Sequence, residues 1–139
     1  MMTIPEIQCL IVTPERTVLD QRAEFVALPL YDGEIGIAPS HTPMIGRLGS
    51  GEMRIRAAEQ TIRFYVEGGF CEVLGNVVTV LTSRAVPSHE IEPDVVAEQL
   101  QAAQRRPARS DDEFAERDRL AVQYRAQLRV AQRAAKAAK

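Results

Sequence analysis

Apolar and polar side chains alternate along much of the first two thirds of the chain. In residues 52–56 and 61–67 every second position is apolar, with Ile62, Phe64 and Val66 on one side of the second stretch. A period of two is typical of a β-strand that buries one face and exposes the other. We therefore expect both stretches to be strands of half-buried sheets.

Four apolar runs in the same part of the chain predict further strands. They span residues 7–12, 25–30, 70–74 and 77–81, and the last two flank Gly75-Asn76, a pair typical of two-residue hairpin turns. Many short strands separated by turn residues are typical of sandwiches and barrels. We expect an N-terminal antiparallel β-sandwich or barrel of about ten short strands.

The spacing becomes helical in the last third of the sequence. Residues 92–94, Glu-Pro-Asp, predict a helix start, because proline is tolerated in the first turn and an acidic residue there suits the helix dipole. Val96, Leu100 and Ala103 then recur at intervals of four and three, and Pro107 ends the pattern. A first helix is predicted between the two prolines.

A second helix is predicted to begin at Ser110. Ser110-Asp-Asp-Glu113 has the form of a capping box, in which two side chains bond free backbone N–H groups of the first turn. One narrow apolar stripe follows at helical spacing: Phe114, Ala121, Tyr124, Leu128, Ala131 and Ala135. Joined by a turn of about three or four residues, the two helices would form an αα-hairpin.

The alanine-rich stripe limits how much apolar area the hairpin can bury. At about 25 cal/mol per Å², its burial against one partner gives a modest gain. We expect the hairpin to undock more easily than the sandwich unfolds, and so to adopt two arrangements. The predicted fold class is α+β, with a β-sandwich domain at residues 1–87 and a regulatory helical hairpin at residues 88–139.

Charge is distributed unevenly along the chain. Residues 1–93 carry 7 Arg and 12 acidic residues, giving −5, whereas residues 94–139 carry 10 Arg or Lys and 7 acidic residues, giving +3. The two values together give the net charge of −2. Such asymmetry indicates two modules with different partners.

Few residues of the chain could support catalysis or metal binding. Cys9 and Cys71 lie in apolar runs typical of buried, reduced thiols. His41 and His89 have no carboxylates or cysteines at ligand spacing. The sequence has no phosphate-binding loop, no nucleophile elbow and no apolar run long enough to span a bilayer. We therefore expect no catalytic residue, no metal and no membrane insertion.

Residues 32–43, Asp-Gly-Glu-Ile-Gly-Ile-Ala-Pro-Ser-His-Thr-Pro, combine glycines with prolines. Glycine permits backbone angles that other residues avoid, and proline stiffens the chain. The segment is either an ordinary sandwich loop or a rigid loop that presents Glu34, Ile35 and His41 together as a contact surface. Farther along, Gly68-Gly69 indicates a bulge or a close approach of backbones.

Two stretches of the chain resemble the epsilon subunits of rotary F-type ATP synthases. They are residues 32–43 and residues 64–81, the latter built on Val-Glu-Gly-Gly-Phe, and they occur in the family's order. The family usually has glycine where this chain has Ser40. The resemblance implies that four residues contact the ring of c subunits: Glu34, Ile35, His41 and Thr42.

The resemblance also implies a function. The chain would be a non-catalytic central-stalk subunit of a proton-translocating F-type ATP synthase, coupling rotation of the c ring to ATP synthesis. Its sandwich would bind the gamma subunit on one side and the c ring at one end. Because no secretory signal opens the sequence, we expect a peripheral protein at the cytoplasmic face of the bacterial inner membrane.

Arg125, Arg129 and Arg133 stand four residues apart on one face of the second predicted helix. This pattern indicates either a solvated face or attraction to an acidic partner. In the family, the extended hairpin reaches acidic loops of the catalytic beta and alpha subunits and restrains ATP hydrolysis. The resemblance implies this inhibitory contact for the three arginines.

Some bacterial members of the family bind ATP through the motif Ile/Leu-Asp-x-x-Arg-Ala in the first helix. The matching segment here is residues 91–96, Ile-Glu-Pro-Asp-Val-Val. Glu92 replaces the aspartate and Val95 the arginine, so a cation that could face phosphate is missing. We expect no bound nucleotide and no cofactor.

The residues leave other functions to be weighed. A small β-barrel metalloenzyme would need more than the two histidines of this chain. Nucleic-acid binding is disfavoured by the acidic sandwich and by the acidic residues that begin the second helix. The main alternative is a free-standing β-sandwich adaptor that binds another protein.

Overall fold

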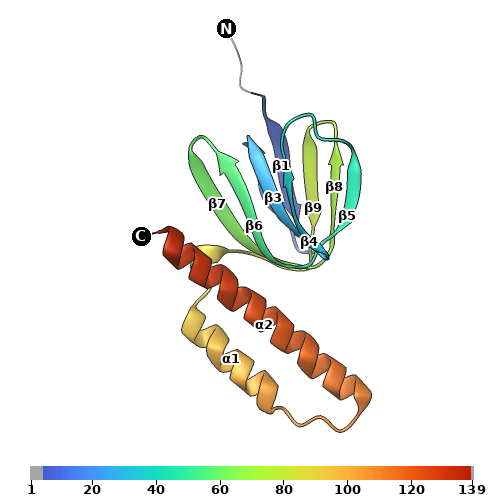
Figure 1. The fold of residues 1–139 in the computed structure, drawn as a ribbon, viewed down its shortest axis with the longest axis vertical. Coiled ribbons are helices and arrows are strands. Elements are labelled where there is room, and N and C mark those ends of the chain that lie inside the picture. The colour runs from blue at the N-terminus through green and yellow to red at the C-terminus, as the bar shows by residue number, and fades with distance from the viewer. Residues whose placement is uncertain (1–4, 139) are drawn as a thin grey trace. The chain divides into compact units, whose positions relative to one another are not determined.

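The computed structural model describes residues 5–138 and divides into two compact units, the first ending at Pro87 and the second beginning at Ser88. The first unit consists of ten strands arranged in two sheets (Figure 1). Their bounds are β1 Ile7–Val12, β2 Thr17–Ala23, β3 Phe25–Leu30, β4 Gly33–Ile37, β5 Met44–Arg47, β6 Ser50–Ala57, β7 Gln60–Glu67, β8 Phe70–Leu74, β9 Val77–Leu81 and β10 Ala85–Pro87.

The two sheets have five strands each and form a β-sandwich. One has the strand order β2-β1-β9-β8-β5, and the other has the order β10-β7-β6-β3-β4. Neighbouring strands are antiparallel except β1 and β9, which run parallel with Gln8 opposite Val77. The predicted sandwich is confirmed, and this parallel pair is the exception to its antiparallel character. No hairpin joins β1 to β9, so no short turn forces them to be antiparallel.

Alternating apolar side chains from both sheets meet in one core. Ile55, Phe64 and Val66, which belong to the stretches with a period of two, are buried there, as predicted. Each fully buried side chain of this size contributes about 1.5–3 kcal/mol of transfer free energy. The largest other fully buried apolar members are Ile7, Ile11, Leu28, Ile37, Met53, Val26, Val78, Val80 and Cys9.

Glycines at two turns are explained by backbone geometry. Gly75 and Asn76 have φ values of 57° and 61°, as a two-residue turn between β8 and β9 requires. Gly69 has a φ of 102°, and a Cβ atom at this position would lie 1.9 Å from the carbonyl oxygen of Leu81. Gly68-Gly69 therefore marks the close approach of backbones that the sequence indicated.

The segment at residues 32–43 is not one loop, because Gly33–Ile37 form strand β4. Gly36 faces the ring of Phe25 on β3, and a Cβ atom there would lie 2.7 Å from Phe25 Cζ. Glycine makes room here for an aromatic ring on the neighbouring strand rather than forming a turn. The prediction of a single rigid loop is wrong, and the connection to β5 is limited to residues 38–43.

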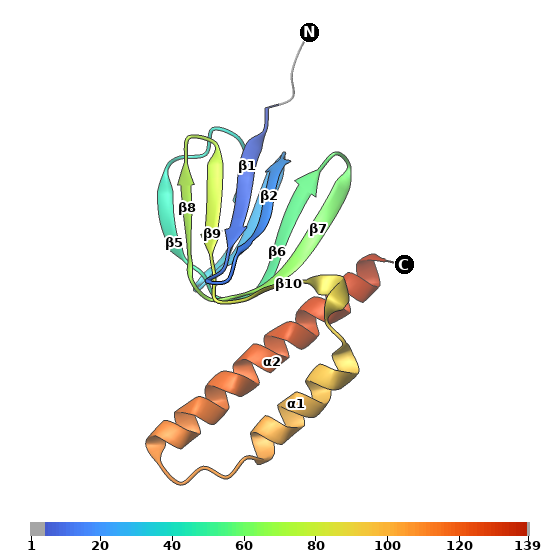
Figure 2. The same ribbon diagram turned by 180° about the vertical axis from the view of Figure 1, so that it is seen from behind.

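The second unit contains η1 Ser88–Glu90, α1 Pro93–Arg105 and α2 Asp111–Ala137. The two long helices lie side by side as a hairpin (Figure 2), which confirms the predicted helices. Residues 106–110 connect them, more than the predicted three or four residues. Arg106 is extended, with a ψ of 126°, because a following proline disfavours the helical conformation.

Ser110 caps α2 as predicted. Its Oγ accepts a hydrogen bond from the Glu113 backbone N–H at 3.1 Å, a contact of the kind that typically stabilises a helix by about 1 kcal/mol. The return contact differs from a capping box, since Glu113 Oε2 accepts from the Arg109 N–H at 2.8 Å. The glutamate thus fixes the residue before the cap.

The apolar stripe of α2 follows the prediction only in its middle. Four predicted members are buried or half-buried, whereas Phe114 and Ala135 are exposed. Ala126, Gln127 and Val130 are buried in addition. α2 has 27 residues and α1 has 13. Since both helices rise 1.5 Å per residue, about half of α2 extends beyond α1. Part of that extension contacts η1, so the residues of α2 that are buried differ from the predicted stripe.

Candidate partner-binding surfaces

Strand β4 separates the four residues predicted to contact the c ring. Glu34 pairs with Pro29 beside the turn between β3 and β4. His41 and Thr42 lie beyond the opposite end of β4, in the loop that leads to β5 (Figure 1). Since a strand of this length spans about 15 Å, Glu34 lies toward one end of the sandwich and His41 and Thr42 lie toward the other, with Ile35 in the middle of β4. The contacts themselves stay predictions.

Glu34 forms a two-pronged ion pair with Arg54 of β6. Its Oε1 lies 2.7 Å from Arg54 Nη2, and its Oε2 accepts a hydrogen bond from Nη1 at 3.1 Å. The Glu34 side chain is 48% exposed, so it remains accessible from solvent. The hydrogen bond to Glu34 is the largest cause of a raised pKa at the Arg54 guanidinium.

The same arginine also contacts a buried carboxylate. Arg54 Nη1 donates to Glu52 Oε1 at 3.2 Å, and Arg63 Nη1 donates to both oxygens of Glu52 at 3.1 Å. The Glu52 side chain is buried, so these charge-assisted hydrogen bonds compensate part of its lost hydration. Glu34, Arg54, Glu52 and Arg63 form what we name the charged row. It crosses the outer face of the sheet from β4 to β7.

The Ile35 side chain points to the inner face of the sheet, opposite to Glu34. It pairs with Leu28 of β3 and packs, half-buried, against the sandwich core. Alternation along β4 requires this, because Glu34 and Ile35 are consecutive and must point to opposite faces. Of these two residues, Glu34 is the one whose side chain lies on the outer face of the sheet.

A hydrogen bond from a neighbouring hairpin holds the loop at residues 38–43. The Ser40 N–H donates to Asn76 Oδ1 at 2.7 Å, and the Asn76 carbonyl accepts from the Gln8 N–H at 2.8 Å. Ser40 has a φ of 66°, a conformation that glycine adopts most easily. The glycine that the family resemblance implies at this position would adopt this conformation without strain. His41 Nδ1 lies 2.7 Å from the Thr42 carbonyl oxygen.

The outer face of the sheet β5-β8-β9 carries large exposed apolar side chains. Phe70 opposes Leu81 and Leu74 opposes Val77 across the β8–β9 hairpin, while Ile45 extends the patch onto β5. Ile45 is 76% exposed and Phe70 is 56% exposed. We name these five residues the apolar face. Glu72 and Thr79 lie on the same side of the sheet, between the two apolar pairs. Exposed apolar side chains gathered in this way are typical of a protein-binding surface.

Sequence patterns contained a signal for the apolar face that the strand predictions did not use. Residues 70–74 and 77–81 are apolar at most positions on both sides of the strand. A strand exposed to water on one side normally alternates. Apolar residues on both sides therefore indicate a second covered face.

Arg125, Arg129 and Arg133 are exposed along α2, on a side distinct from the buried Ala126, Val130 and neighbouring positions. Their spacing of four places them in one line along the helix, as predicted. Their contact with an acidic partner stays a prediction.

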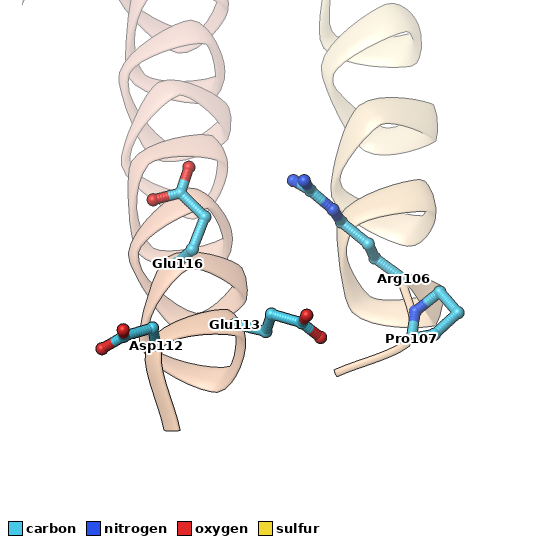
Figure 3. Close-up of a pocket in the computed structure, with 5 residues that line it drawn as sticks. All are labelled: Arg106, Pro107, Asp112, Glu113 and Glu116. Atoms are coloured by element: carbon cyan, nitrogen blue, oxygen red, sulfur yellow. The ribbon is translucent and has the colours of Figure 1, made fainter. Parts of the chain in front are cut away.

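A hollow of about 460 Å³ lies where the two helices connect (Figure 3). Arg106 and Pro107 line one side, and Asp112, Glu113 and Glu116 line the other. Glu116 pairs with Arg119 at 2.7 Å, and Glu113 holds the Arg109 N–H. These contacts stabilise the start of α2 and the loop before it, so the carboxylates have a structural role.

The remaining reactive groups of the described chain are buried thiols. Burial raises the pKa of Cys9 to about 12 and also raises that of Cys71. Within residues 5–138, no cluster of three or more His, Cys, Asp or Glu side chains is arranged to hold a metal ion. Of the helices described, none is long and apolar enough to cross a membrane.

Comparisons with known proteins identify the family of the chain. The family described as ATP synthase, Delta/Epsilon chain, beta-sandwich domain matches residues 6–88. The ATP synthase epsilon chain of Rhodopirellula baltica is 42% identical over 123 residues, covering 88% of this chain and 96% of that protein. The ATP synthase epsilon chain of Carboxydothermus hydrogenoformans is 40% identical over 99 residues, covering 71% of this chain and 74% of that protein.

Two solved structures share the fold. A chain of the Euglena gracilis mitochondrial ATP synthase has a TM-score of 0.74 at 20% identity, covering 99% of this chain and 85% of that one. A chain from the central stalk and c ring of the Tetrahymena thermophila mitochondrial ATP synthase has a TM-score of 0.70 at 12% identity, covering 94% and 99%. The motifs at residues 32–43 and 64–81, the sandwich, the helical hairpin and these relatives agree: the chain belongs to the epsilon subunit family of ATP synthases.

Proposed function

We propose that this chain is a non-catalytic central-stalk subunit of a proton-translocating F-type ATP synthase, peripheral to the cytoplasmic face of the bacterial inner membrane. The sandwich transmits rotation of the c ring, and the hairpin restrains ATP hydrolysis. The observation that carries the proposal is the match to epsilon chains over 88% of the chain. The apolar face and the exposed arginines support separate partners for the two units.

The apolar face is the surface proposed to bind the gamma subunit. It is contributed by three neighbouring strands of one sheet, with Glu72 and Thr79 between its apolar members, which suits a rigid, permanent contact. A charge placed in such a contact is desolvated without a partner, which is strongly unfavourable. Leu81→Glu should therefore weaken binding to purified gamma subunit by about 100-fold.

Thr61→Glu provides the matched control for this experiment. It adds the same charge at an exposed strand position of the other sheet and should leave gamma affinity unchanged. Unchanged affinity in Leu81→Glu would exclude the apolar face as the gamma site. If the wild-type chain did not bind gamma at all, the adaptor alternative would replace the stalk function.

The separation of Glu34 from His41 divides the proposed c-ring contact. Glu34, with Ile35 beneath it, lies at the end proposed to face the c ring. His41 and Thr42 directly precede β5, whose Ile45 belongs to the apolar face, so they lie nearer the proposed gamma contact. A photoreactive group attached to cysteine at position 34 should cross-link to subunit c in the assembled complex. The same group at position 42 tests the predicted c-ring contact of Thr42, which cross-linking to gamma alone would contradict.

The arginine line of α2 is proposed to contact acidic loops of the catalytic subunits when the hairpin is extended. A hairpin that switches between two arrangements needs contacts that differ between them. The arginines would supply contacts that form only in the extended arrangement. Reversing charge in Arg125→Glu with Arg129→Glu should raise ATP hydrolysis of the complex. Arg109→Glu, at another exposed arginine in the connection between the helices, is the control and should have no effect.

A further inference from the structure

Glu34 is held in place by a residue of a non-adjacent strand. It lies on β4, which is the edge strand of its sheet, and β3 separates it from Arg54 on β6. Arg54 pairs with Ala27 of β3, and the small side chain of that alanine allows the arginine to reach across the strand. Both oxygens of the Glu34 carboxylate receive hydrogen bonds from the Arg54 guanidinium.

Arg54 is itself fixed from the other side. It donates to the buried Glu52, which in turn receives two hydrogen bonds from Arg63 of β7. The planar guanidinium of Arg54 binds a carboxylate in one geometry, so fixing the arginine also fixes the orientation of the Glu34 carboxylate. The charged row therefore connects the centre of the sheet to a half-exposed carboxylate at its edge.

We propose that Arg54 is a positioning residue for the c-ring contact of Glu34, an inference that rests on the function proposed above. A glutamate side chain on an edge strand normally samples several rotamers, and a partner must immobilise it on binding. Arg54 orders the carboxylate beforehand, so the partner meets it in one orientation and the entropic cost of binding falls.

The affinity of full-length chain for the complex of gamma and c ring tests this role, with affinity for gamma alone measured in parallel. Arg54→Gln should weaken binding to the complex by about 3–10-fold, the range for one newly mobile side chain, and leave gamma binding unchanged. Arg54→Lys keeps the charge without the fork and should give an intermediate loss. Arg56→Gln, on the same face of β6, is the control and should bind as wild type.

A charge exchange separates positioning from simple stability. Glu34→Arg combined with Arg54→Glu restores an ion pair between the two positions but leaves a second carboxylate beside the buried Glu52, so the double variant should melt above Arg54→Glu alone although below the wild type. It presents a cation where the partner meets an anion, so its affinity for the complex should be as low as that of Glu34→Ala. Recovery of wild-type affinity by the exchange would overturn the proposal.

The remaining outcomes distinguish this proposal from the function on which it rests. Wild-type affinity of Arg54→Gln alongside weakened Glu34→Ala would overturn the role of Arg54 while retaining the c-ring contact. Wild-type affinity of Glu34→Ala would exclude the contact itself, and the positioning role with it. An equal loss of gamma binding in Arg54→Gln would show a folding defect and likewise overturn the proposal.

Discussion

The sandwich and the helical hairpin differ most in what they bury. The sandwich core contains Ile, Leu, Val, Met and Phe side chains from both sheets, whereas four of the six buried apolar residues described in the hairpin are alanine. Since burial free energy scales with apolar area, each buried residue of the hairpin contributes less. The sandwich is suited to be a rigid platform, and the hairpin to rearrange at small energetic cost.

The two units also differ in how their charges are used. On the sandwich, Glu34 and Glu52 are paired with arginines. On α2, acidic residues gather in the first turn, where they stabilise the helix dipole, and arginines follow along the exposed side. The Glu116–Arg119 pair of α2 is exposed, so the sandwich holds these charges in a partly buried network whereas α2 presents its charges to solvent.

The largest expected effect is a loss of sandwich stability at Gly69, where the backbone lies close to the Leu81 carbonyl. Gly69→Ala should destabilise the sandwich by about 3 kcal/mol or more, because the added Cβ overlaps the Leu81 carbonyl and φ is positive. Gly68→Ala is the matched control, since a Cβ there meets nothing within 4 Å, and it should cost only about 1 kcal/mol. Denaturant unfolding of both variants measures the difference.

A pair of core truncations sharpens the comparison between units. Ile55→Ala should destabilise the sandwich by about 3 kcal/mol, and Val96→Ala should destabilise the hairpin by roughly 1.5 kcal/mol. Far-ultraviolet circular dichroism follows helix loss, and near-ultraviolet tyrosine signals follow the sandwich when both variants also carry Tyr124→Phe, because the other two tyrosines, Tyr31 and Tyr65, belong to the sandwich. If both variants shifted both signals equally, the units would unfold as one and the contrast drawn above would be wrong.

The smallest effect concerns the buried thiol of Cys9. Its pKa is raised by burial from 9.0 to about 12, so the unfolded chain loses this proton at lower pH than the folded one. The resulting stability is complete below about pH 9 and is lost as the pH rises toward 12. Between pH 8 and pH 10 the wild type should lose about 1.3 kcal/mol more than Cys9→Ala. Equal losses would contradict a buried, protonated thiol.

Local patterns predicted much of the fold. The strand bounds at residues 7–12, 25–30, 70–74 and 77–81 match the structure, because these runs are strongly apolar and bounded by turn residues. The cap at Ser110 was also predictable, since it depends on residues within one helical turn. Such elements are set by interactions between near neighbours in sequence.

Contacts between distant residues were not predictable in the same way. Gly36 is glycine because Phe25 covers it, and nothing in the local sequence distinguishes this from a turn glycine. The pairing of Glu34 with Arg54 joins residues 20 positions apart through an intervening strand. The length of α2 beyond α1 likewise moved the buried stripe, because burial depends on the partner as well as on periodicity.

The division of labour between the two units is tested most directly by removing α2. The complex should be reconstituted with the full chain and, in parallel, with a chain ending at Arg106, and both ATP hydrolysis and ATP-driven proton pumping should be measured. The account predicts severalfold faster hydrolysis with pumping per ATP retained. Unchanged hydrolysis, or loss of assembly without α2, would contradict it.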